Sequence, residues 1–404
     1  MGAPSGMNPR LDALQPYPFE RWRSLIGTQS PCPDHTPIAL SIGEPRHPTP
    51  RFIQEALCAH LNELAHYPQT LGSRGLREAL ANWLEHRFHL PPLDPDTEVL
   101  PTLGSREALF SITQTLLDPG AGERVVCPNP FYQIYEGATL LAGGLPYFVN
   151  ADPAQAYHID YSQVPEAVWT HTRLVFICSP GNPTGRVLSL EEWARLFALS
   201  DRHGFTLVSD ECYSEIYPLD SAPPLGGLEA AQRLGRSGYP RLLVMGSLSK
   251  RSNVPGLRSA FVAGDRELLR RFVLYRTYHG SAMNPAVQAA SAAAWRDEMH
   301  VQENRRLYQA KMTLFYDRVH PHLPLVRPQA GFYYWVQVPG SDTDFARALY
   351  LKRNVAVLPG SYLARTVHGF NPGTGQVRIA LVGSLEETGE AIERLLDFLA
   401  HYPS

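Results

Sequence analysis

Short apolar runs alternate with longer segments of helical periodicity through the middle of the chain, and this alternation restricts the fold more than any other feature. The strand-like runs are RVVCP (124–128), RLVFICS (173–179), FTLVS (205–209), RLLVMG (241–246) and RSAFVA (258–263). The helical segments lie near residues 74–87, 105–117, 131–142, 189–203 and 265–277. Strands joined by helical crossovers form a mostly parallel sheet that is buried on both faces. The sequence therefore predicts an α/β fold with helices on both sides of a central sheet.

The pattern changes after a long helical stretch at 285–320. Three further strand-like runs follow, namely FYYWVQV (332–338), NVAVLP (354–359) and QVRIALV (376–382), with helices near 343–352 and 385–400. At 404 residues the chain also exceeds the usual size of a single core. We therefore predict a large domain of residues 46–290 and a smaller α+β domain of residues 291–404. The proline-rich residues 1–45 are predicted to form an arm that packs with the small domain.

Composition excludes several classes of protein. A net charge of −3 provides no basic surface for nucleic acid or an anionic membrane. The five cysteines include no CxxC pair, which argues against a zinc site or a disulfide framework and fits reduced thiols. No apolar run reaches membrane-spanning length, and the N-terminal residues MGAPSG lack the features of a secretory signal. We therefore expect a cytoplasmic enzyme or binding protein.

Polar side chains follow three of the strand-like runs. Asn182 lies in SPGNPTGRVL, Asp210 ends the run FTLVSD with Tyr213 three residues later, and Lys250 lies in SLSKRSNVPGLR. Ligands of open α/β sheets bind at the carboxyl ends of parallel strands, so these side chains are predicted to face one crevice. Taken singly, Asp210 could instead cap a helix and Lys250 could be a solvated surface lysine.

The segment TLGSREALF (102–110) joins a strand to a helix. Gly104 and Ser105 stand at the helix start, where unpaired backbone N–H groups attract an anion such as phosphate. An ordinary serine N-cap, with Glu107 in the first turn, is the alternative.

Together these residues match the requirements of pyridoxal phosphate. An amine that attacks the cofactor aldehyde must be desolvated and close to cations, which suits Lys250. A carboxylate such as Asp210 must keep the pyridine nitrogen protonated, because the pyridinium ring accepts electrons. An arginine such as Arg258 must join the helix N-terminus in holding the phosphate.

The sequence resembles the class I/II aminotransferases, which have fold type I of the pyridoxal-phosphate enzymes. The resemblance extends from SIGEP (41–45) to QVRIAL (376–381). The family pattern S-x-S-K-x-x-x-x-P-G-x-R appears here as SLSKRSNVPGLR, which implies that Lys250 is the Schiff-base lysine.

The resemblance also implies the other cofactor contacts. The implied set is Tyr67, Ser105, Arg106, Tyr132, Asn182, Asp210, Tyr213, Ser247, Ser249, Lys250 and Arg258. In the family, the positions of Ser105 and Arg106 offer backbone N–H groups to the phosphate, and that of Asp210 pairs with the pyridine nitrogen. Tyr132 is the implied stacking aromatic residue. Tyr67 matches a tyrosine that reaches the phosphate of the neighbouring subunit, which implies a homodimer.

Catalytic and substrate-binding roles follow from the same resemblance. Lys250, Asp210 and Tyr213 are the implied catalytic residues. Asn182 joins Tyr213 in donating to the phenolate oxygen of the cofactor and also contacts substrate. Arg378 in VRIAL matches the arginine that holds the substrate α-carboxylate, and Gly43 adds a backbone contact.

One departure from the family pattern concerns specificity. Many relatives read G-E-P-[DN]-F, whereas this chain reads GEPRHPTP with Arg46 and His47. Together with MNPRLDALQPYPFERWRSLI, this segment resembles the proteobacterial succinyldiaminopimelate aminotransferases of lysine biosynthesis. Their substrate carries extra carboxylates, so Arg46 is predicted to bind a distal one; pairing with a surface acid is the alternative. The two histidines of HRFH (86–89) are interpreted as helix surface and not as a metal site.

The leading hypothesis is therefore an aminotransferase that passes the amino group of glutamate to N-succinyl-2-amino-6-oxopimelate. An aspartate, alanine or kynurenine aminotransferase, or a β-lyase, remains possible on the same fold. A non-catalytic regulatory domain that binds pyridoxal phosphate is a further alternative, but such domains usually follow a DNA-binding helix-turn-helix.

Overall fold

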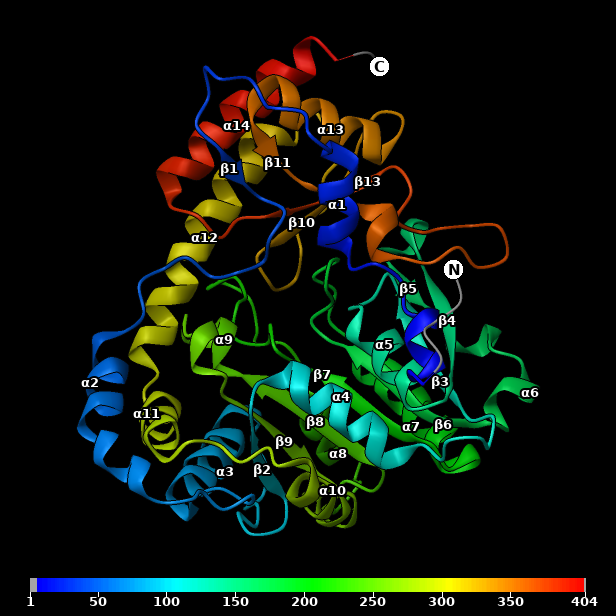
Figure 1. Cartoon of the computed structure of the whole chain (residues 1–404), viewed down its shortest axis with the longest axis vertical. Helices are drawn as coiled ribbons and strands as arrows, with labels where there is room; N and C mark the ends of the chain where they lie inside the picture. The colour runs from blue at the N-terminus through cyan, green and yellow to red at the C-terminus, as the bar shows by residue number, and fades with distance from the viewer. Residues whose placement is uncertain (1–5, 403–404) are drawn as a thin grey trace.

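A computed structural model describes residues 6–402 (Figure 1). Its centre is an eight-stranded sheet of order β2-β9-β8-β7-β6-β3-β4-β5. The strands are β2 (Val99–Thr102), β3 (Arg124–Asn129), β4 (Leu145–Asp152), β5 (His158–Ile159), β6 (Thr172–Cys178), β7 (Thr206–Asp210), β8 (Leu242–Ser247) and β9 (Ala260–Gly264). The five strands from β8 to β4 are mutually parallel, whereas β9 is antiparallel to both of its neighbours and β5 to β4. The predicted α/β class is confirmed.

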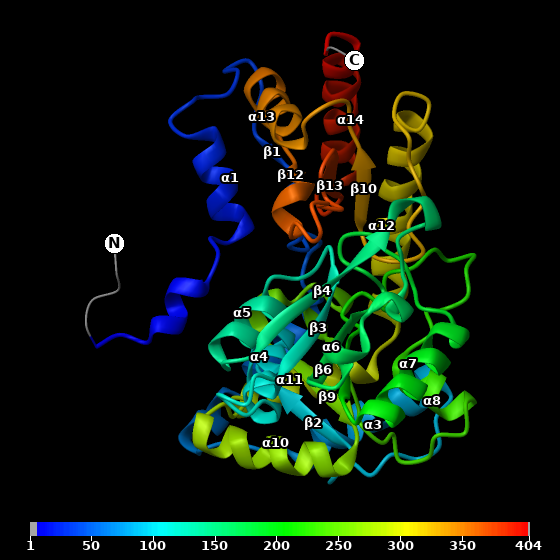
Figure 2. The ribbon, with the colours of Figure 1, turned by 90° about the vertical axis from the view of Figure 1, so that its right-hand side faces the viewer.

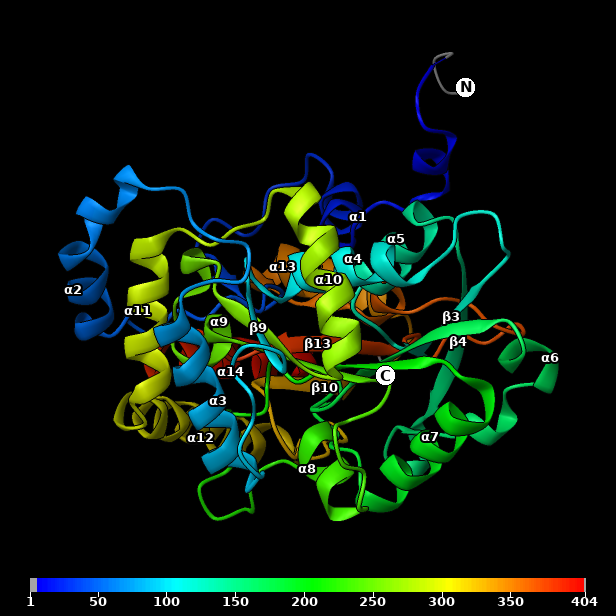
Figure 3. The same cartoon turned by 90° about the horizontal axis from the view of Figure 1, so that it is seen from below.

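Helices cover both faces of this sheet (Figure 3). One face carries α4 (Ser105–Leu116), α5 (Ile134–Leu141) and α10 (Arg266–His279). The other carries α3 (Arg74–Phe88), α7 (Leu190–His203), α8 (Gly227–Arg233) and α11 (Pro285–Arg296). Successive strand residues point to opposite faces, so Val125 packs in the first core and Val126 in the second. Both faces are apolar, which explains why the strands read as continuous hydrophobic runs.

The C-terminal part of the chain has its own core. Its antiparallel sheet has the order β10-β13-β12, formed by β10 (Tyr333–Gln337), β12 (Leu358–Pro359) and β13 (Gln376–Ala380). The helices α13 (Asp342–Arg353) and α14 (Leu385–Ala400) pack against it. The N-terminal segment joins this core through Trp22 of α1 (Pro18–Ile26) and through β1 (Ile38–Ala39), which pairs with β11 (Val355–Ala356) (Figure 2). The domain boundaries at residues 45 and 290 stay a prediction.

The long helical stretch predicted at 285–320 is two helices. Asp297 has an extended backbone (φ −108°, ψ 128°), which ends α11 and separates it from α12 (Met299–Val319). In Figure 1, α12 rises from the end of α11, beside the large sheet, to α14 in the C-terminal part. This single helix therefore contacts both cores, and its side chains can link the two.

Several elements were not predicted from the sequence. The edge strand β2 contains Pro101, which is tolerated because only β9 pairs with it. Strand β4 is only partly buried, so its apolar pattern is weak. The helix expected over 131–142 begins only at Ile134. Other short helices are α2 (Arg51–Ala59), α6 (Glu166–Trp169) and α9 (Leu248–Arg251), with 3₁₀ turns η1 (Pro9–Ala13), η2 (Leu61–Ala65), η3 (Pro153–Gln155), η4 (Tyr161–Gln163), η5 (Pro255–Leu257) and η6 (Gly360–Leu363). Within residues 6–402, no helix has the length and apolarity that crossing a membrane requires.

Candidate active site

A cavity of about 780 Å³ opens at the carboxyl ends of β6, β7 and β8. It is lined by most of the residues that the sequence pointed to: Gly43, Ser105, Arg106, Tyr132, Asn182, Asp210, Tyr213, Ser247, Ser249, Lys250, Arg258 and Arg378. These residues come from segments more than 300 positions apart in the chain, and the fold brings them to one crevice. Arg46 and Tyr67 are not part of this lining.

Lys250 lies in the short helix α9, directly after β8. The Ser247 hydroxyl accepts a hydrogen bond of 3.1 Å from the Ser249 N–H and so caps this turn. The Lys250 ammonium donates to the carbonyl oxygen of Gly43. Burial is the main reason that the pKa of Lys250 falls from 10.5 to about 8, and the nearby Arg378 lowers it further. A large fraction of this amine is therefore unprotonated, and nucleophilic, at mildly alkaline pH.

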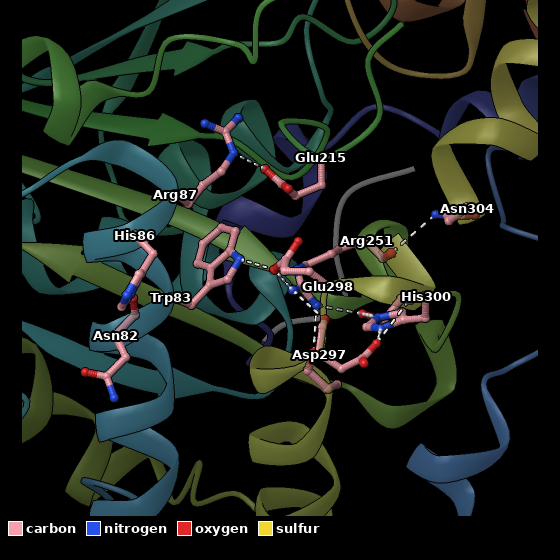
Figure 4. Close-up of polar contacts among 12 residues, drawn as sticks. Asn82, Trp83, His86, Arg87, Glu215, Arg251, Asp297, Glu298, His300 and Asn304 are labelled. Carbon is pink, nitrogen blue, oxygen red and sulfur yellow. Dashed lines mark hydrogen bonds and ion pairs between the residues drawn. The ribbon is translucent and has the colours of Figure 1, made fainter. Parts of the chain in front are cut away.

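The turn that carries Lys250 rests on a polar network around the buried side chain of Arg251 (Figure 4). The Arg251 side chain is 1% exposed and lies against the rings of Trp83 and Trp295. Its guanidinium pairs with the Glu298 carboxylate at 2.5 Å and donates to the Ala294 carbonyl at 2.8 Å. These contacts hold the backbone next to Lys250 in one position.

Asp210 ends β7 with its carboxylate inside the cavity. The Cys212 N–H donates to Oδ1 at 3.3 Å, and the Tyr135 hydroxyl donates to Oδ2 at 3.0 Å. Burial dominates and raises the pKa of Asp210, although these hydrogen bonds and the positive Lys250 lower it. Asp210 forms no ion pair with any residue in the range 6–402. A bound cation beside this carboxylate would therefore be strongly favoured.

An anion-binding corner lies where α4 begins. Gly104 has a φ of +91°, and a Cβ at this position would lie 2.1 Å from the Arg258 guanidinium. Only glycine therefore lets the arginine approach the first turn of α4, where the backbone N–H groups of Ser105 and Arg106 have no helical partner. The hydroxyls of Ser247 and Ser249 line the same cavity. Together these groups form a site suited to a phosphate.

Arg378 projects from β13 into the other side of the cavity. Its guanidinium donates to Asn182 Oδ1 at 3.1 Å and to the Ser41 carbonyl at 2.8 Å, and its Nε has no partner among the described residues. It also lies 4.4 Å from the centre of the Tyr333 ring. Gly43 permits this arrangement, because a Cβ there would overlap the Tyr333 hydroxyl. The remaining donors of Arg378 suit a carboxylate.

Arg106 carries a further cation at the cavity wall. Its Nε donates to the Tyr132 hydroxyl at 2.6 Å, and its guanidinium lies 5.9 Å from the ring of Tyr17. Among residues 6–402 no carboxylate pairs with it. Tyr17 and Phe19, which precede and begin α1, also line the cavity. Sequence reasoning assigned Arg106 only a backbone role and missed both aromatic residues.

Arg46 forms the kind of contact that the surface alternative expects. Its guanidinium is half exposed and pairs with the Glu387 carboxylate at 2.6 Å. The prediction that Arg46 reads a distal carboxylate therefore has no geometric support. Tyr67 is fully exposed after η2 and contacts no part of its own cavity.

Two residues at the site could not be identified from the sequence pattern. Tyr135 donates to Asp210 from within NPFYQIY, a segment from which we chose only Tyr132. The hydroxyl of Tyr333 lies 2.9 Å from that of Tyr213 and belongs to FYYWVQV, which reads as an ordinary strand.

Comparison with known proteins gives one consistent family. The family model described as aminotransferase class I and II matches residues 35–395. LL-diaminopimelate aminotransferase 2 of Trichormus variabilis is 30% identical over 398 residues, covering 96% of this chain and 97% of that protein. A solved aminotransferase of Neisseria meningitidis Z2491 is 52% identical with a TM-score of 0.94, covering 97% of this chain and 100% of that one. An aminotransferase of Helicobacter pylori 26695 is 36% identical with a TM-score of 0.87, covering 95% and 98%.

Proposed function

This chain belongs to the class I and II aminotransferases, and from that premise we propose that it transfers an amino group from glutamate to N-succinyl-2-amino-6-oxopimelate. The family works with pyridoxal phosphate, and this chain is an aminotransferase that uses the same cofactor. The observation that carries the proposal is the convergence of the buried amine of Lys250, the carboxylate of Asp210 and the guanidinium of Arg378 in one cavity.

The cavity fits pyridoxal phosphate. Arg258 and the start of α4 form a cationic corner that glycine at position 104 keeps open. The Asp210 carboxylate, buried and without an ion pair among residues 6–402, suits a protonated ring nitrogen. We propose that Asn182 and Tyr213 donate to the phenolate oxygen of the cofactor. The remaining proposed contacts are the backbone N–H groups of Ser105 and Arg106 and the hydroxyls of Ser247 and Ser249 to the phosphate, Tyr132 over the ring and Lys250 to the aldehyde carbon.

Each residue then has a defined task in the reaction. Pyridoxal phosphate, when bound, supplies an electron-accepting ring that stabilises negative charge on the substrate Cα. Arg378 and Asn182 orient the α-carboxylate so that the Cα–H bond faces Lys250. The unprotonated Nζ of Lys250 would remove this proton from Cα and hold it for the return transfer. Asp210 holds the proton on the ring nitrogen throughout.

The proposed acceptor follows from the charges of the cavity wall. With Lys250 and Arg258 facing the cofactor and Arg378 facing the α-carboxylate, Arg106 is the arginine of the lining that has no assigned partner. A guanidinium there suits a second carboxylate in two parallel hydrogen bonds. The far end of the succinylated substrate carries two carboxylates, so Arg106 supports a substrate of this class.

LL-Diaminopimelate is the second candidate, because several relatives bear that name. Its far end carries an ammonium group as well as a carboxylate. Glu44 lines the cavity and is exposed, and it could pair with that ammonium. Aspartate, alanine, kynurenine and β-lyase substrates lack this long distal group and leave Arg106 with shorter or no partners.

We further propose that the working unit is a homodimer. Several large apolar side chains between α2 and α3 and along α10 are exposed: Leu61, Leu64, Tyr67, Leu274 and Tyr278. A partner subunit that covers them would remove this apolar area from water. It would also allow Tyr67 to reach the phosphate of the partner.

The test is a substrate panel with purified protein and pyridoxal phosphate. Glutamate with N-succinyl-2-amino-6-oxopimelate should give the highest kcat/KM. Free LL-diaminopimelate with 2-oxoglutarate, aspartate and kynurenine should all be slower. A preference for free LL-diaminopimelate would contradict the succinylated substrate and leave the aminotransferase assignment intact.

A further inference from the structure

The imidazole of His47 is held at both ring nitrogens by residues of α12. Its Nδ1 lies 2.8 Å from Asn304 Oδ1, and its Nε2 lies 2.8 Å from the Lys311 amine. Asn304 is 2% exposed and Lys311 is 1% exposed, so both contacts are sheltered from water. Lys311 is one of three lysines in the chain, and neither the proposed reaction nor the cofactor uses it.

The hydrogen bonds around Asn304 define the protonation of His47. The Asn304 amide nitrogen donates to the carbonyls of Lys250 at 3.2 Å and Arg251 at 3.3 Å, so its oxygen must be the atom that faces His47. That oxygen can only accept, and His47 Nδ1 must therefore donate. The Lys311 amine donates to the Gly383 carbonyl at 2.7 Å, and its protonated form has no lone pair, so beside His47 that form can only donate to Nε2. His47 is thus neutral, with its proton on Nδ1.

The segment that His47 anchors reaches the proposed catalytic lysine and the α-carboxylate arginine. Four residues before His47, the Gly43 carbonyl accepts from the Lys250 amine. Two residues earlier, the Ser41 carbonyl accepts from Arg378 at 2.8 Å. Asn304 holds the backbone of Lys250 as well as His47 (Figure 4 shows it beside the turn of Arg251). One helix therefore fixes both the lysine turn and loop 41–47.

We propose that His47, Asn304 and Lys311, here called the His47 latch, position loop 41–47 against Lys250 and Arg378 for substrate binding. These three are positioning residues, because they act through the loop and the lysine turn and do not touch the reacting atoms. The proposal rests on the aminotransferase activity of the family and is independent of which keto or aldehyde acceptor is the natural one.

The first test measures the half-reaction of the holoenzyme with glutamate. His47→Phe and Lys311→Met should each raise KM for glutamate about tenfold, the effect of one lost hydrogen bond, and change kcat by less than about threefold. The double variant should lose no more than the worse single variant, because both changes open the same contact. Arg46→Ala, in the same loop but outside the latch, is the matched control and should behave as wild type.

The second test is the pH dependence of that KM. Protonation of His47 would place a new N–H against Lys311, so the latch should open and KM should rise as the pH falls below about 6.5, the ordinary pKa of histidine. Burial and Lys311 both lower the pKa of His47, whereas Asn304 and Glu303 raise it. Lys311→Met removes the ammonium group against which the new N–H would lie, so its KM should be raised at neutral pH and should not rise further at low pH.

Other charges near the latch need their own control. Glu387 of α14 raises the pKa of Lys311 and Arg46 lowers it. The Tyr308 ring lies 4.5 Å from the His47 ring at an interplanar angle of 44° and carries no charge. In Arg46→Ala, the pH below which KM rises should stay within a few tenths of a pH unit of the wild-type value. If the rise of KM at low pH persisted unchanged in Lys311→Met, or disappeared in Arg46→Ala, the assignment to His47 would be overturned.

Unchanged KM in His47→Phe, or fully additive losses in the double variant, would also overturn the proposal. His47→Asn retains a side-chain donor and should restore most of the wild-type KM, which a merely space-filling role would not predict. His47→Asn also replaces His47→Phe as the test variant if the phenylalanine variant fails to fold. Inactivity of the wild type with every amino donor would instead contradict the proposed function.

Discussion

The hydroxyl of Tyr135 donates a 3.0 Å hydrogen bond to Oδ2 of Asp210, at the end of the central strand β7. The Tyr135 ring stacks on Phe176 of the neighbouring strand β6, which fixes the direction of the hydroxyl. With the Cys212 N–H on Oδ1, both carboxylate oxygens are held. The Asp210 carboxylate is therefore held in one orientation within the cavity.

The first prediction concerns this pair. Asp210→Asn should retain bound pyridoxal phosphate but lower kcat by on the order of ten- to a thousand-fold, since one preorganised charge is lost. Tyr135→Phe should keep the charge and lose only its orientation, so kcat should fall by less than about tenfold. Single-turnover kinetics with glutamate, with cofactor content checked by absorbance, measure both. Equal losses in the two variants would mean that orientation, not charge, dominates.

The second prediction follows from the lowered pKa of Lys250. Covalent capture of pyridoxal phosphate by the cofactor-free protein requires the unprotonated amine, so its rate should rise with pH and level off above about 8. An ordinary lysine would keep gaining up to its pKa of 10.5. Arg378→Gln removes a positive neighbour and should move the midpoint upwards. Lys250→Ala should bind the cofactor without the visible absorbance of the lysine-linked form and should not transaminate.

The third prediction distinguishes the contributions of Arg106, Glu44 and Arg46 to substrate binding. Arg106→Gln should raise KM for a substrate with a distal carboxylate by roughly ten- to a hundred-fold, the range for a charged hydrogen bond. Glu44→Gln should weaken free LL-diaminopimelate selectively if its ammonium is the group recognised. Arg46→Ala should change neither KM by more than about twofold, because an exposed ion pair contributes little. Steady-state kinetics with both substrates measure these effects. A large effect of Arg46→Ala would support the prediction that Arg46 binds a distal carboxylate.

The fourth prediction concerns stability. Burial lowers the pKa of Lys311 to about 7, compared with 10.5 for a free lysine. Between these values the unfolded chain binds a proton that the folded chain lacks, so the free energy of unfolding should rise with pH from about 7. The contribution of Lys311 has an upper limit of about 1.4 kcal/mol per pH unit. Urea unfolding of the holoenzyme at pH 7, 8 and 9 should show a shallower rise in Lys311→Met; identical slopes would contradict it.

The fifth prediction is that the protein is a dimer at micromolar concentration. Tyr67→Phe should weaken phosphate binding, so the affinity for pyridoxal phosphate should fall while the dimer persists. Sedimentation and a cofactor titration measure the two properties separately. A fully active monomer would refute the shared site, and Tyr278→Phe, at another exposed tyrosine, serves as a control that should retain cofactor affinity.

Much of the large sheet was predictable because its residues are buried on both faces. The runs that became β3, β6, β7, β8 and β9 are apolar throughout, and such runs can hardly be satisfied outside a central sheet. Strand β4 and the edge strand β2 escaped prediction, because partial burial and Pro101 weaken the same signal. The break between α11 and α12 depends on the backbone of one residue, Asp297, within a sequence of good helix formers.

The sequence by itself determined which chemistry the chain carries, because Asn182, Asp210 and Lys250 each follow a strand and parallel strands end at one edge. The tertiary structure alone decided what Arg46, His47 and Arg106 contact. All three are ordinary polar residues in the sequence, and their roles depend on segments far away: Glu387 for Arg46, Lys311 for His47, Tyr17 for Arg106. Long polar side chains can satisfy their hydrogen bonds in many ways, and only the packing of distant elements selects one.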